Sequence, residues 1–598
     1  MKKVRKYIIP FIFLSSFALF TNSKVDVHYS PKREVARATN AKIDLDKSPA
    51  TPLWVNTTFT SNMVLQRNKR VKIFGYGGEA GEVVTVNFAG QTKTTENTAD
   101  GWALYLDAMI ENKVGQTLTI IHKEQTITLT NVVVGDVLLC SGQSNMAFQL
   151  QYFVNKRASV KTEYMSLNNY KNIRVYDASS VNLERSEPTI YQESLGRSWK
   201  LCNDYDSIKF YSAYALGAAS NYSSVVGDSV PIGIIIAAVS GTQIEEWIDP
   251  ATIASNSFIS YAGDRNSRYY NGYIHNLAGY TISGFLWYQG CSNADPGMVN
   301  DYKIAFSMML SHYRQIFENP TLPAIVQQLV QLTSVVEISY IRIAQWKFMS
   351  TISNVYTING FDTGDMSPTD GIHPVDKWVL GQRVAGALAL ASGIKKDEML
   401  NQDLPYGVSS AITSATCVQD GDEKVITINT ANEDDYWTAT GDITGFQIFC
   451  DYTWQDVTAT VVDGKIQIRT TLAEATRIRY NFCNGYIHGG SQPYARVETP
   501  VFVYAGGLPL AIARRIDVEM SDDPLPPTSS EPDVSEPDTE EPSDSAIATS
   551  LPAETSVPEE EAKPSATNPV GLTVGIGILS LGLGLGLGVL LTKRKIIK

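Results

Sequence analysis

Hydrophobic and polar positions along the chain follow three successive patterns, and each pattern predicts a different kind of fold. Between residues 51 and 131, short segments such as VKIFGYG and TLTIIH alternate polar and apolar residues and are separated by glycines. Alternation over segments of this length is typical of half-buried strands. The pattern therefore predicts an N-terminal β-sandwich domain.

Residues 132–396 show fully apolar runs that alternate with segments of helical period. The runs expected to be strands are VVVGDVLLC, PIGIIIAAVSGT, GFLWYQG, PAIVQQLV and VYTING. The helical period is found at residues 210–226, 301–317 and 377–392. Buried strands alternating with helices predict an α/β domain whose parallel sheet is covered on both faces.

Residues 397–517 return to strand-like segments such as KVITINT and KIQIRT, which predict a second, C-terminal β-sandwich domain. The two ends of the chain have a different composition. The segments expected there are a signal peptide at 1–23, a linker at 24–50, a disordered acidic stalk rich in Pro, Ser and Thr at 518–568, a transmembrane helix at 570–591 and a cytoplasmic basic tail at 592–598. The folded part is then expected outside the cell, anchored by its C-terminus.

The formal net charge of −13 says little about partners, because residues 517–561 alone contain fifteen acidic side chains and no Lys or Arg. The folded part is close to neutral. Nucleic-acid binding, which needs a clustered basic surface, is therefore not expected. The six cysteines are spread singly, without the close pairs of a zinc site, so no metal is expected either.

A candidate nucleophile follows the first apolar run of the α/β region, which is expected to turn at Gly135-Asp136 and to end in the motif SGQSN at 141–145. Ligand sites of open α/β sheets lie beyond the carboxyl ends of the strands. A serine raised there by a glycine turn is a candidate nucleophile. We assign this role to Ser144, with Ser141 as the alternative.

A serine hydroxyl needs a neighbouring base, and His373 is the candidate. It lies in the sequence DGIHP, where the following proline favours an extended conformation just before a helix. Asp370 lies three residues earlier and is close enough to orient the imidazole. His275, in the sequence NGYIHNL, is the alternative base.

Attack on an ester carbonyl also needs hydrogen-bond donors for the oxyanion. Gly241 follows a predicted strand, so its backbone N–H can point into the site. Asn293 follows another strand and offers a side-chain amide. The candidate nucleophile, the two oxyanion donors and the base thus each come after a predicted strand of the same domain.

Together these segments resemble the sialate O-acetylesterase family, a branch of the SGNH hydrolases. The resemblance rests on CSGQSNM at 140–146, the turn leading to EEW at 245–247, WYQGCSN at 287–293 and DGIHP at 370–374. Outside the α/β region it includes MVLQR at 63–67 and FAGQ at 88–91.

The resemblance implies a three-layer α/β/α hydrolase domain of the SGNH type that releases acetate from O-acetylated sugars, without a metal or organic cofactor. Its catalytic roles map onto nucleophile Ser144, base His373, orienting acid Asp370 and oxyanion donors Gly241 and Asn293. The residues expected to contact the substrate are Gln143, Asn145 and Gln289.

Two positions depart from the family pattern. Ser240 stands where the family usually has glycine, and Cys291 stands where it has glutamate. The first change affects the backbone beside Gly241, and the second removes a carboxylate next to the site. Substrate preference is therefore open between acetylated sialic acid and acetylated polysaccharides such as xylan.

The main hypothesis is an extracellular serine esterase that acts on O-acetylated glycans or sialic acid and is held at the membrane by its C-terminal helix. A hypothesis of another class is a surface-displayed glycan-binding protein with an inactive esterase domain. The sequence leaves the oligomeric state open.

Overall fold

The structure, a computed structural model, describes residues 52–521 except 167, 192–193, 296, 331–336, 364–371 and 483–500. The predicted signal peptide, linker, transmembrane helix and basic tail lie outside this range, as does the stalk beyond residue 521. In the part of the chain that is described, no helix is long and apolar enough to cross a bilayer.

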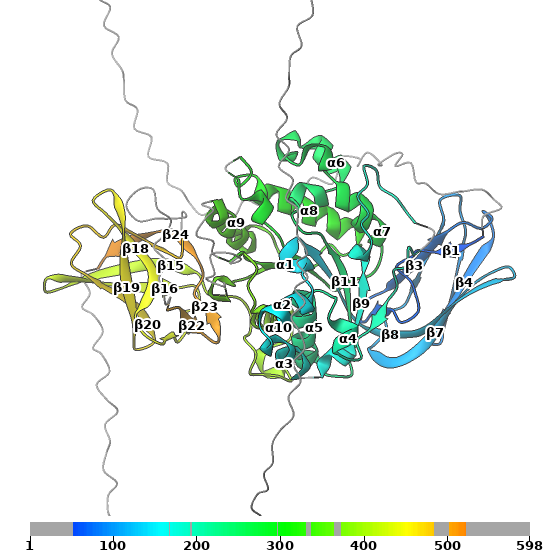
Figure 1. Cartoon of the computed structure of the whole chain (residues 1–598), viewed down its shortest axis with the longest axis horizontal. Helices are drawn as coiled ribbons and strands as arrows, with labels where there is room; N and C mark the ends of the chain where they lie inside the picture. The colour runs from blue at the N-terminus through cyan, green and yellow to red at the C-terminus, as the bar shows by residue number, and fades with distance from the viewer. Residues whose placement is uncertain are drawn as a thin grey trace, which may run out of the picture. The chain divides into compact units, whose positions relative to one another are not determined.

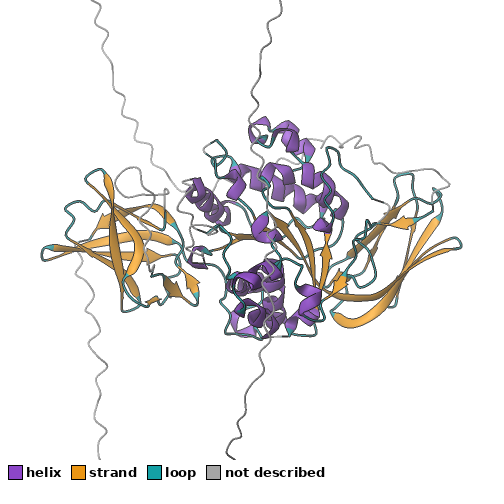
Figure 2. Ribbon diagram, viewed as in Figure 1, coloured by secondary structure: helices purple, strands orange, loops and turns teal. Residues whose placement is uncertain are grey.

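A parallel sheet forms the centre of the α/β region (Figures 1 and 2). Its strands lie in the order β9-β11-β8-β12-β13-β14, with the short β10 antiparallel at one edge. Their bounds are β8 (Gln125–Gly142), β9 (Ile173–Asp177), β10 (Lys200–Leu201), β11 (Ile232–Ala238), β12 (Gly284–Tyr288), β13 (Ala324–Gln327) and β14 (Val355–Ile358). Every residue of β11, β12 and β13 is buried, as expected for central strands of a sheet that has helices on both faces.

Helices cover both faces of this sheet. Helices α8 and α9 lie on one side of it, and α5 and α10 lie on the other (Figure 1). The α-helices are α1 (Ser144–Ala147), α2 (Leu150–Lys156), α3 (Ser159–Ser166), α4 (Tyr205–Ile208), α5 (Ala213–Val226), α6 (Pro250–Ser255), α7 (His275–Leu277), α8 (Tyr302–Ile316), α9 (Glu337–Thr351) and α10 (Lys377–Ala391). The predicted helical segments correspond to α5, α8 and α10, and the sequence analysis missed α9.

Strand β8 is continuous, so the predicted turn at Gly135-Asp136 is wrong. Its first half pairs with β7 (Asn112–His122) and its second half lies between β11 and β12. Glycine is needed at 135 for close approach, since a Cβ there would lie 1.9 Å from the carbonyl oxygen of Pro231. Asp136 is held by Arg67, whose Nη2 lies 2.9 Å from Oδ2.

The N-terminal region consists of two sheets that share one buried core. One sheet contains β1 (Trp54–Val55), β3 (Val71–Tyr76) and β6 (Trp102–Leu106); the other contains β4 (Val83–Phe88), β5 (Gln91–Glu96), β7 and the start of β8, with β2 (Val64–Gln66) parallel to β8. Ile73 and Leu104 of the first sheet are buried in the same cluster as Val86 and Ile120 of the second.

The C-terminal region closes into a barrel, so the sandwich predicted for it is wrong. Its strands are β15 (Ile412–Asp420), β16 (Glu423–Thr430), β18 (Ile443–Cys450), β19 (Thr453–Val462), β20 (Lys465–Thr470), β21 (Arg477–Tyr480) and β24 (Ala513–Met520). Closure comes from the parallel pairing of β24 with β15, where Ala415 lies opposite Val518. Alternating polarity predicts strands but does not show whether the last one returns to the first. A small sheet of β17 (Thr438–Ala439), β22 (Val503–Ala505) and β23 (Leu508–Pro509) lies apart from the barrel path.

Helices α5 and α10 approach closely because glycines face each other. A Cβ at Gly381 would lie 2.5 Å from the carbonyl carbon of Gly217. Real Cβ atoms do not come so near to backbone, so a side chain at 381 would push the helices apart. This contact sets the position of α10, at whose start the site segment 372–377 lies.

We expect Gly381→Ala to lower the free energy of unfolding by about 1–2 kcal/mol. The added Cβ meets backbone atoms, which cannot move aside, so we expect the upper part of the ~1–3 kcal/mol range of overpacking costs, which exceeds the roughly 1 kcal/mol of helix propensity that alanine adds. Urea unfolding followed by circular dichroism measures the effect. Gly441→Ala is the matched control, since a Cβ there meets no atom within 4 Å. Equal unfolding midpoints for the two variants would contradict this account.

Candidate active site

Three neighbouring strands bring the predicted site segments to one edge of the sheet. Gly142, at the end of β8, lies opposite Ala238 of β11 on one side and Tyr288 of β12 on the other. The chain leaves the three strands at the same level. The segments that follow, at 143–147, 239–243 and 289–293, therefore start side by side, as at the ligand sites of other open α/β sheets.

The turn after β8 places Ser144 at the first position of α1. Gly142 has a φ of +140°, and a Cβ there would lie 2.2 Å from the carbonyl oxygen of Tyr288. Only glycine fits this approach. Gln143 then continues in an extended conformation, and its backbone N–H donates to the same carbonyl at 3.0 Å. Ser144 is 7% exposed.

The imidazole of His373 meets the Ser144 hydroxyl although the two residues are 229 positions apart. His373 Nε2 lies 2.9 Å from Ser144 Oγ. In the tautomer that leaves Nε2 unprotonated, this nitrogen accepts the hydroxyl hydrogen and can withdraw the proton. The ring of Phe148 packs beside the imidazole with 4.5 Å between centroids, which restricts its rotation.

Asn145 ties the segment that carries His373 to the turn that carries Ser144. Its Nδ2 donates to the carbonyl oxygen of Ile372 at 2.8 Å, and its Oδ1 accepts from Lys377 Nζ at 2.5 Å. The side chain is 1% exposed. A substrate contact for Asn145 stays a prediction; both ends of its amide bind the protein and hold His373 over Ser144.

Lys377 is a residue of the site that the sequence analysis missed. It begins α10, it is fully buried, and its Nζ lies 4.7 Å from the ring centre of Tyr288 and 5.4 Å from that of Phe153. A buried ammonium ion needs hydrogen bonds and aromatic faces in place of water. The sequence signal is a lysine at the head of an apolar helix, four residues after His373, which is equally typical of a solvated helix end.

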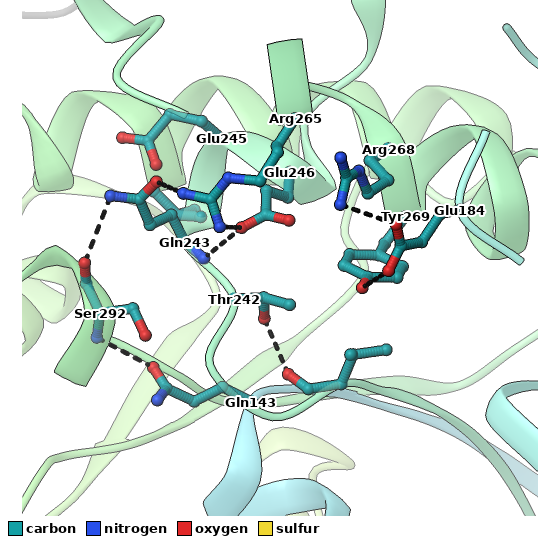
Figure 3. A network of polar contacts seen from close by, with 12 residues as sticks. Gln143, Glu184, Thr242, Gln243, Glu245, Glu246, Arg265, Arg268, Tyr269 and Ser292 are labelled. Carbon is teal, nitrogen blue, oxygen red and sulfur yellow. Dashed lines mark hydrogen bonds and ion pairs between the residues drawn. The ribbon is translucent and has the colours of Figure 1, made fainter. Parts of the chain in front are cut away.

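Gly241 occupies a turn whose backbone favours glycine. Its φ is +76°, and a Cβ there would meet nothing within 4 Å, so conformation rather than space is the constraint. Thr242 Oγ1 donates to the Val239 carbonyl at 2.9 Å (Figure 3) and accepts from Trp247 Nε1 at 3.0 Å. Ser240 is exposed beside it. Oxyanion donation by Gly241 stays a prediction.

The side chain of Asn293 is fully buried and bonded to the protein at both ends. Its Oδ1 accepts from the Ile244 N–H at 2.9 Å and from Gln289 Nε2 at 2.7 Å. Its Nδ2 donates to both oxygens of Glu245, at 3.1 and 2.9 Å. Oxyanion donation by Asn293 stays a prediction, and in this arrangement it requires Nδ2 to leave Glu245.

Gln143 and Gln289 hold the chain after β12 in place. Gln143 Oε1 accepts from the backbone N–H groups of Gly290 at 3.0 Å and Ser292 at 3.3 Å. Gln289 is fully buried, and its Nε2 also donates to the Thr242 carbonyl at 3.0 Å. The segments after all three strands are thus joined by side-chain amides. Substrate contacts of Gln143 and Gln289 stay predictions.

A network of polar and charged side chains links the same loops (Figure 3). Gln243 Nε2 donates to the Ser292 carbonyl at 3.4 Å, and its Oε1 accepts from Arg265 at 2.9 Å. Arg265 also pairs with Glu246 at 3.3 Å. Arg268 and Glu184 form a second pair at 2.7 Å. The loops after β11 and β12 are therefore linked to each other and to the chain around residue 265.

The alternatives left open by the sequence form no catalytic pair. Ser141 is fully buried inside β8, and its Oγ has no hydrogen-bond partner. Burial and the neighbouring His312 lower the pKa of His275 to about 4, and its Nε2 is unpartnered. At Cys291, the second departure from the family pattern, burial raises the pKa of the thiol to about 12, so this residue is protonated at neutral pH and does not replace the missing carboxylate.

Asp370 lies outside the described residues, and its orienting role stays a prediction.

No three His, Cys, Asp or Glu side chains of the described ranges gather as metal ligands would. The cysteines at 140, 202, 291, 417 and 450 are all unbridged.

Glu245 makes the stability of the site dependent on pH. Burial raises its pKa to about 6, against the opposing effect of the hydrogen bonds from Asn293. The folded protein therefore holds this proton more tightly than the unfolded chain does. The resulting stabilisation is complete below the unfolded pKa near 4.5 and is lost as pH rises to about 6.

We expect wild type to lose about 2 kcal/mol of unfolding free energy between about pH 3.5 and 7.5 relative to Glu245→Gln, which keeps an acceptor but does not titrate. Urea unfolding of both proteins across this range gives the difference, in which the other titrating groups cancel. A difference that is constant with pH would show that Glu245 ionises normally.

Comparison with known proteins finds carbohydrate esterases. A family model described as carbohydrate esterase, sialic acid-specific acetylesterase, matches residues 134–389. The sialate O-acetylesterase of Homo sapiens is 27% identical over 387 residues, which are 56% of this chain and 70% of that protein. The Mus musculus enzyme is 25% identical over 400 residues, 56% and 72% of the two chains.

Among solved structures, a carbohydrate acetylesterase from Xanthomonas citri superimposes with a TM-score of 0.62 at 22% identity. The match covers 78% of this chain and all of that one. At this level of identity the likeness shows a shared fold.

Proposed function

We propose that this carboxylic ester hydrolase, whose residues 134–389 belong to the family of sialic acid-specific acetylesterases, removes O-acetyl groups from sialic acids. The observation that carries the proposal is the 2.9 Å contact between Ser144 Oγ and His373 Nε2 at the carboxyl edge of the sheet. Two groups so distant in sequence meet here in the arrangement that a serine esterase needs.

In the proposed reaction, Ser144 Oγ attacks the acetyl carbonyl carbon while its proton passes to His373 Nε2. The negative charge that forms on the carbonyl oxygen is stabilised by the Gly241 N–H, a donor type whose loss typically costs ~10²- to 10³-fold in rate. The bond to the sugar oxygen then breaks, and His373 returns the proton to that oxygen. Water then attacks the carbonyl carbon of acetyl-Ser144 while its proton passes to His373 Nε2; the bond to Ser144 Oγ breaks, acetate leaves, and His373 returns the proton to Oγ.

The scaffold around the pair supports this role. The Asn145 amide joins the His373 segment to the nucleophile turn, and Phe148 limits the rotation of the imidazole. Both contacts keep the base within reach of the hydroxyl without a bound substrate. Catalysis gains from such preorganisation, because the geometry need not be assembled at each turnover.

We further propose that the enzyme acts outside the cell and is anchored by residues 570–591. Support comes from the basic and then apolar start of the chain and from the twenty-two uncharged residues before its basic end. The alternative of a glycan-binding protein with an inactive esterase domain is disfavoured, because Ser144 and His373 are both present and in contact.

We expect Ser144→Ala to lower acetate release from p-nitrophenyl acetate and from O-acetylated sialic acid by at least about 10³-fold, since the nucleophile is lost. His373→Ala should act similarly. Ser141→Ala is the control, a neighbouring serine in β8, and should keep the wild-type rate. Wild-type turnover by Ser144→Ala would eliminate the proposed mechanism.

We expect kcat/KM for O-acetylated sialic acid to exceed that for acetylated xylan by at least about tenfold, because a site specific for one substrate discriminates through transition-state contacts. Acetate release from both substrates at equal acetyl concentration measures this ratio. A ratio in favour of xylan would leave the esterase mechanism intact and replace the substrate.

A further inference from the structure

A cavity of about 630 Å³ lies where helix α9 meets the C-terminal barrel, and none of its lining residues belongs to the site described above. Helix α9 contributes Tyr340 and Trp346, and the barrel contributes Phe449, Trp454 and Phe482. We call it the arginine-aromatic cavity. Its volume is within the range of small-ligand sites and suits one or two sugar residues.

Arginine side chains stand over several of these rings. The guanidinium carbon of Arg479 lies 4.4 Å from the ring centre of Trp454, and that of Arg514 lies 5.1 Å from the ring centre of Tyr340. Stacking of this kind fixes the guanidinium plane. Arg479 Nε donates to Gln447 Oε1 at 2.5 Å, whereas Arg514 is exposed at the cavity. The cavity thus offers oriented donors next to apolar faces.

The lining is strongly basic. The described residues that line the cavity include Lys347, Arg477, Arg479, Arg514 and Arg515 and no Asp or Glu. One carboxylate nearby, Asp517, is shared by Arg477 at 3.3 Å and Arg515 at 3.6 Å. Lys347 and Arg514 form no ion pair with any residue that the structure describes, and both are exposed.

We propose that the arginine-aromatic cavity binds a carboxylated sugar residue of a glycan. Lys347 and Arg514, both in the lining, attract its carboxylate, and the apolar face of the sugar ring packs against the aromatic side chains of the cavity. Aromatic faces alone would suit a neutral sugar, and basic groups alone would suit any anion. Their combination in one cavity favours an acidic sugar.

Helix α9 connects this cavity to the esterase site. Gln345, on the same helix, donates from Nε2 to the Gln289 carbonyl at 2.8 Å. One helix therefore contacts both the chain after β12 and the cavity. An acidic glycan chain held in the cavity is thereby bound to the enzyme that carries Ser144, a consequence for catalysis that rests on the proposed function; the binding itself does not.

Titration calorimetry of the full chain, carrying Ser144→Ala so that no acetyl group is removed, tests the proposal. We expect saturable binding of a non-acetylated trimer of sialic acid and none of neutral xylotriose. Lys347→Ala with Arg514→Ala should weaken the affinity at least ~10-fold, and Trp454→Ala about 5-fold. Lys465→Ala and Arg469→Ala, basic residues of the same barrel outside the cavity, are the matched controls and should bind as the parent does.

The Lys347→Ala, Arg514→Ala variant, made with Ser144 intact, should hydrolyse p-nitrophenyl acetate at the wild-type rate, which separates a loss of glycan binding from a loss of catalysis. The proposal is overturned if the trimer does not bind, if xylotriose binds equally well, or if the control variants lose the same affinity. It is also overturned if a synthetic peptide of residues 531–561 binds the cavity more tightly than the trimer, since the occupant would then be acidic protein.

Discussion

The site depends on the close approach of Gly142 to the carbonyl of Tyr288. A Cβ at position 142 would lie 2.2 Å from this carbonyl oxygen. Glycine there allows β8 and β12 to stay paired up to the point where the chain leaves the sheet. Because the backbone N–H of Gln143 donates to the same carbonyl, the nucleophile turn begins from a fixed position. A larger residue at 142 would part the strands and move Ser144 away from His373.

The base is positioned by packing rather than by proximity in sequence. Helix α10 sits against α5 through Gly381 and Gly217, and its first residue, Lys377, is bonded to Asn145. The same asparagine holds the Ile372 carbonyl. The packing of α10 on α5 thus positions His373 at 2.9 Å from Ser144. The connection passes through the side chains of Lys377 and Asn145, which are buried and do not exchange their partners with water.

On the other face of the sheet, helix α9 contacts both the site and the arginine-aromatic cavity. There α9 contacts the chain after β12 through Gln345 and contributes Tyr340 and Trp346 to the arginine-aromatic cavity. Asn293 Nδ2 donates to Glu245, which partly offsets the rise in the Glu245 pKa that burial causes. Helix α9 therefore contacts both the chain after β12 and the cavity proposed to bind an acidic sugar.

The sequence by itself determined five strands of the α/β sheet (β8 and β11 to β14), the glycine turn before Ser144 and the candidate base His373, because burial and backbone conformation are reflected in residue type; it did not predict β9 and β10. Only the tertiary structure decided that β8 runs on through Gly135, that the last strand closes a barrel, that Lys377 is buried against Asn145, and that Asn293 is bonded to Glu245. Each of these depends on which distant group a residue meets. Polarity patterns report how deeply a side chain is buried, whereas its partner is set by the register and packing of elements far apart in the chain.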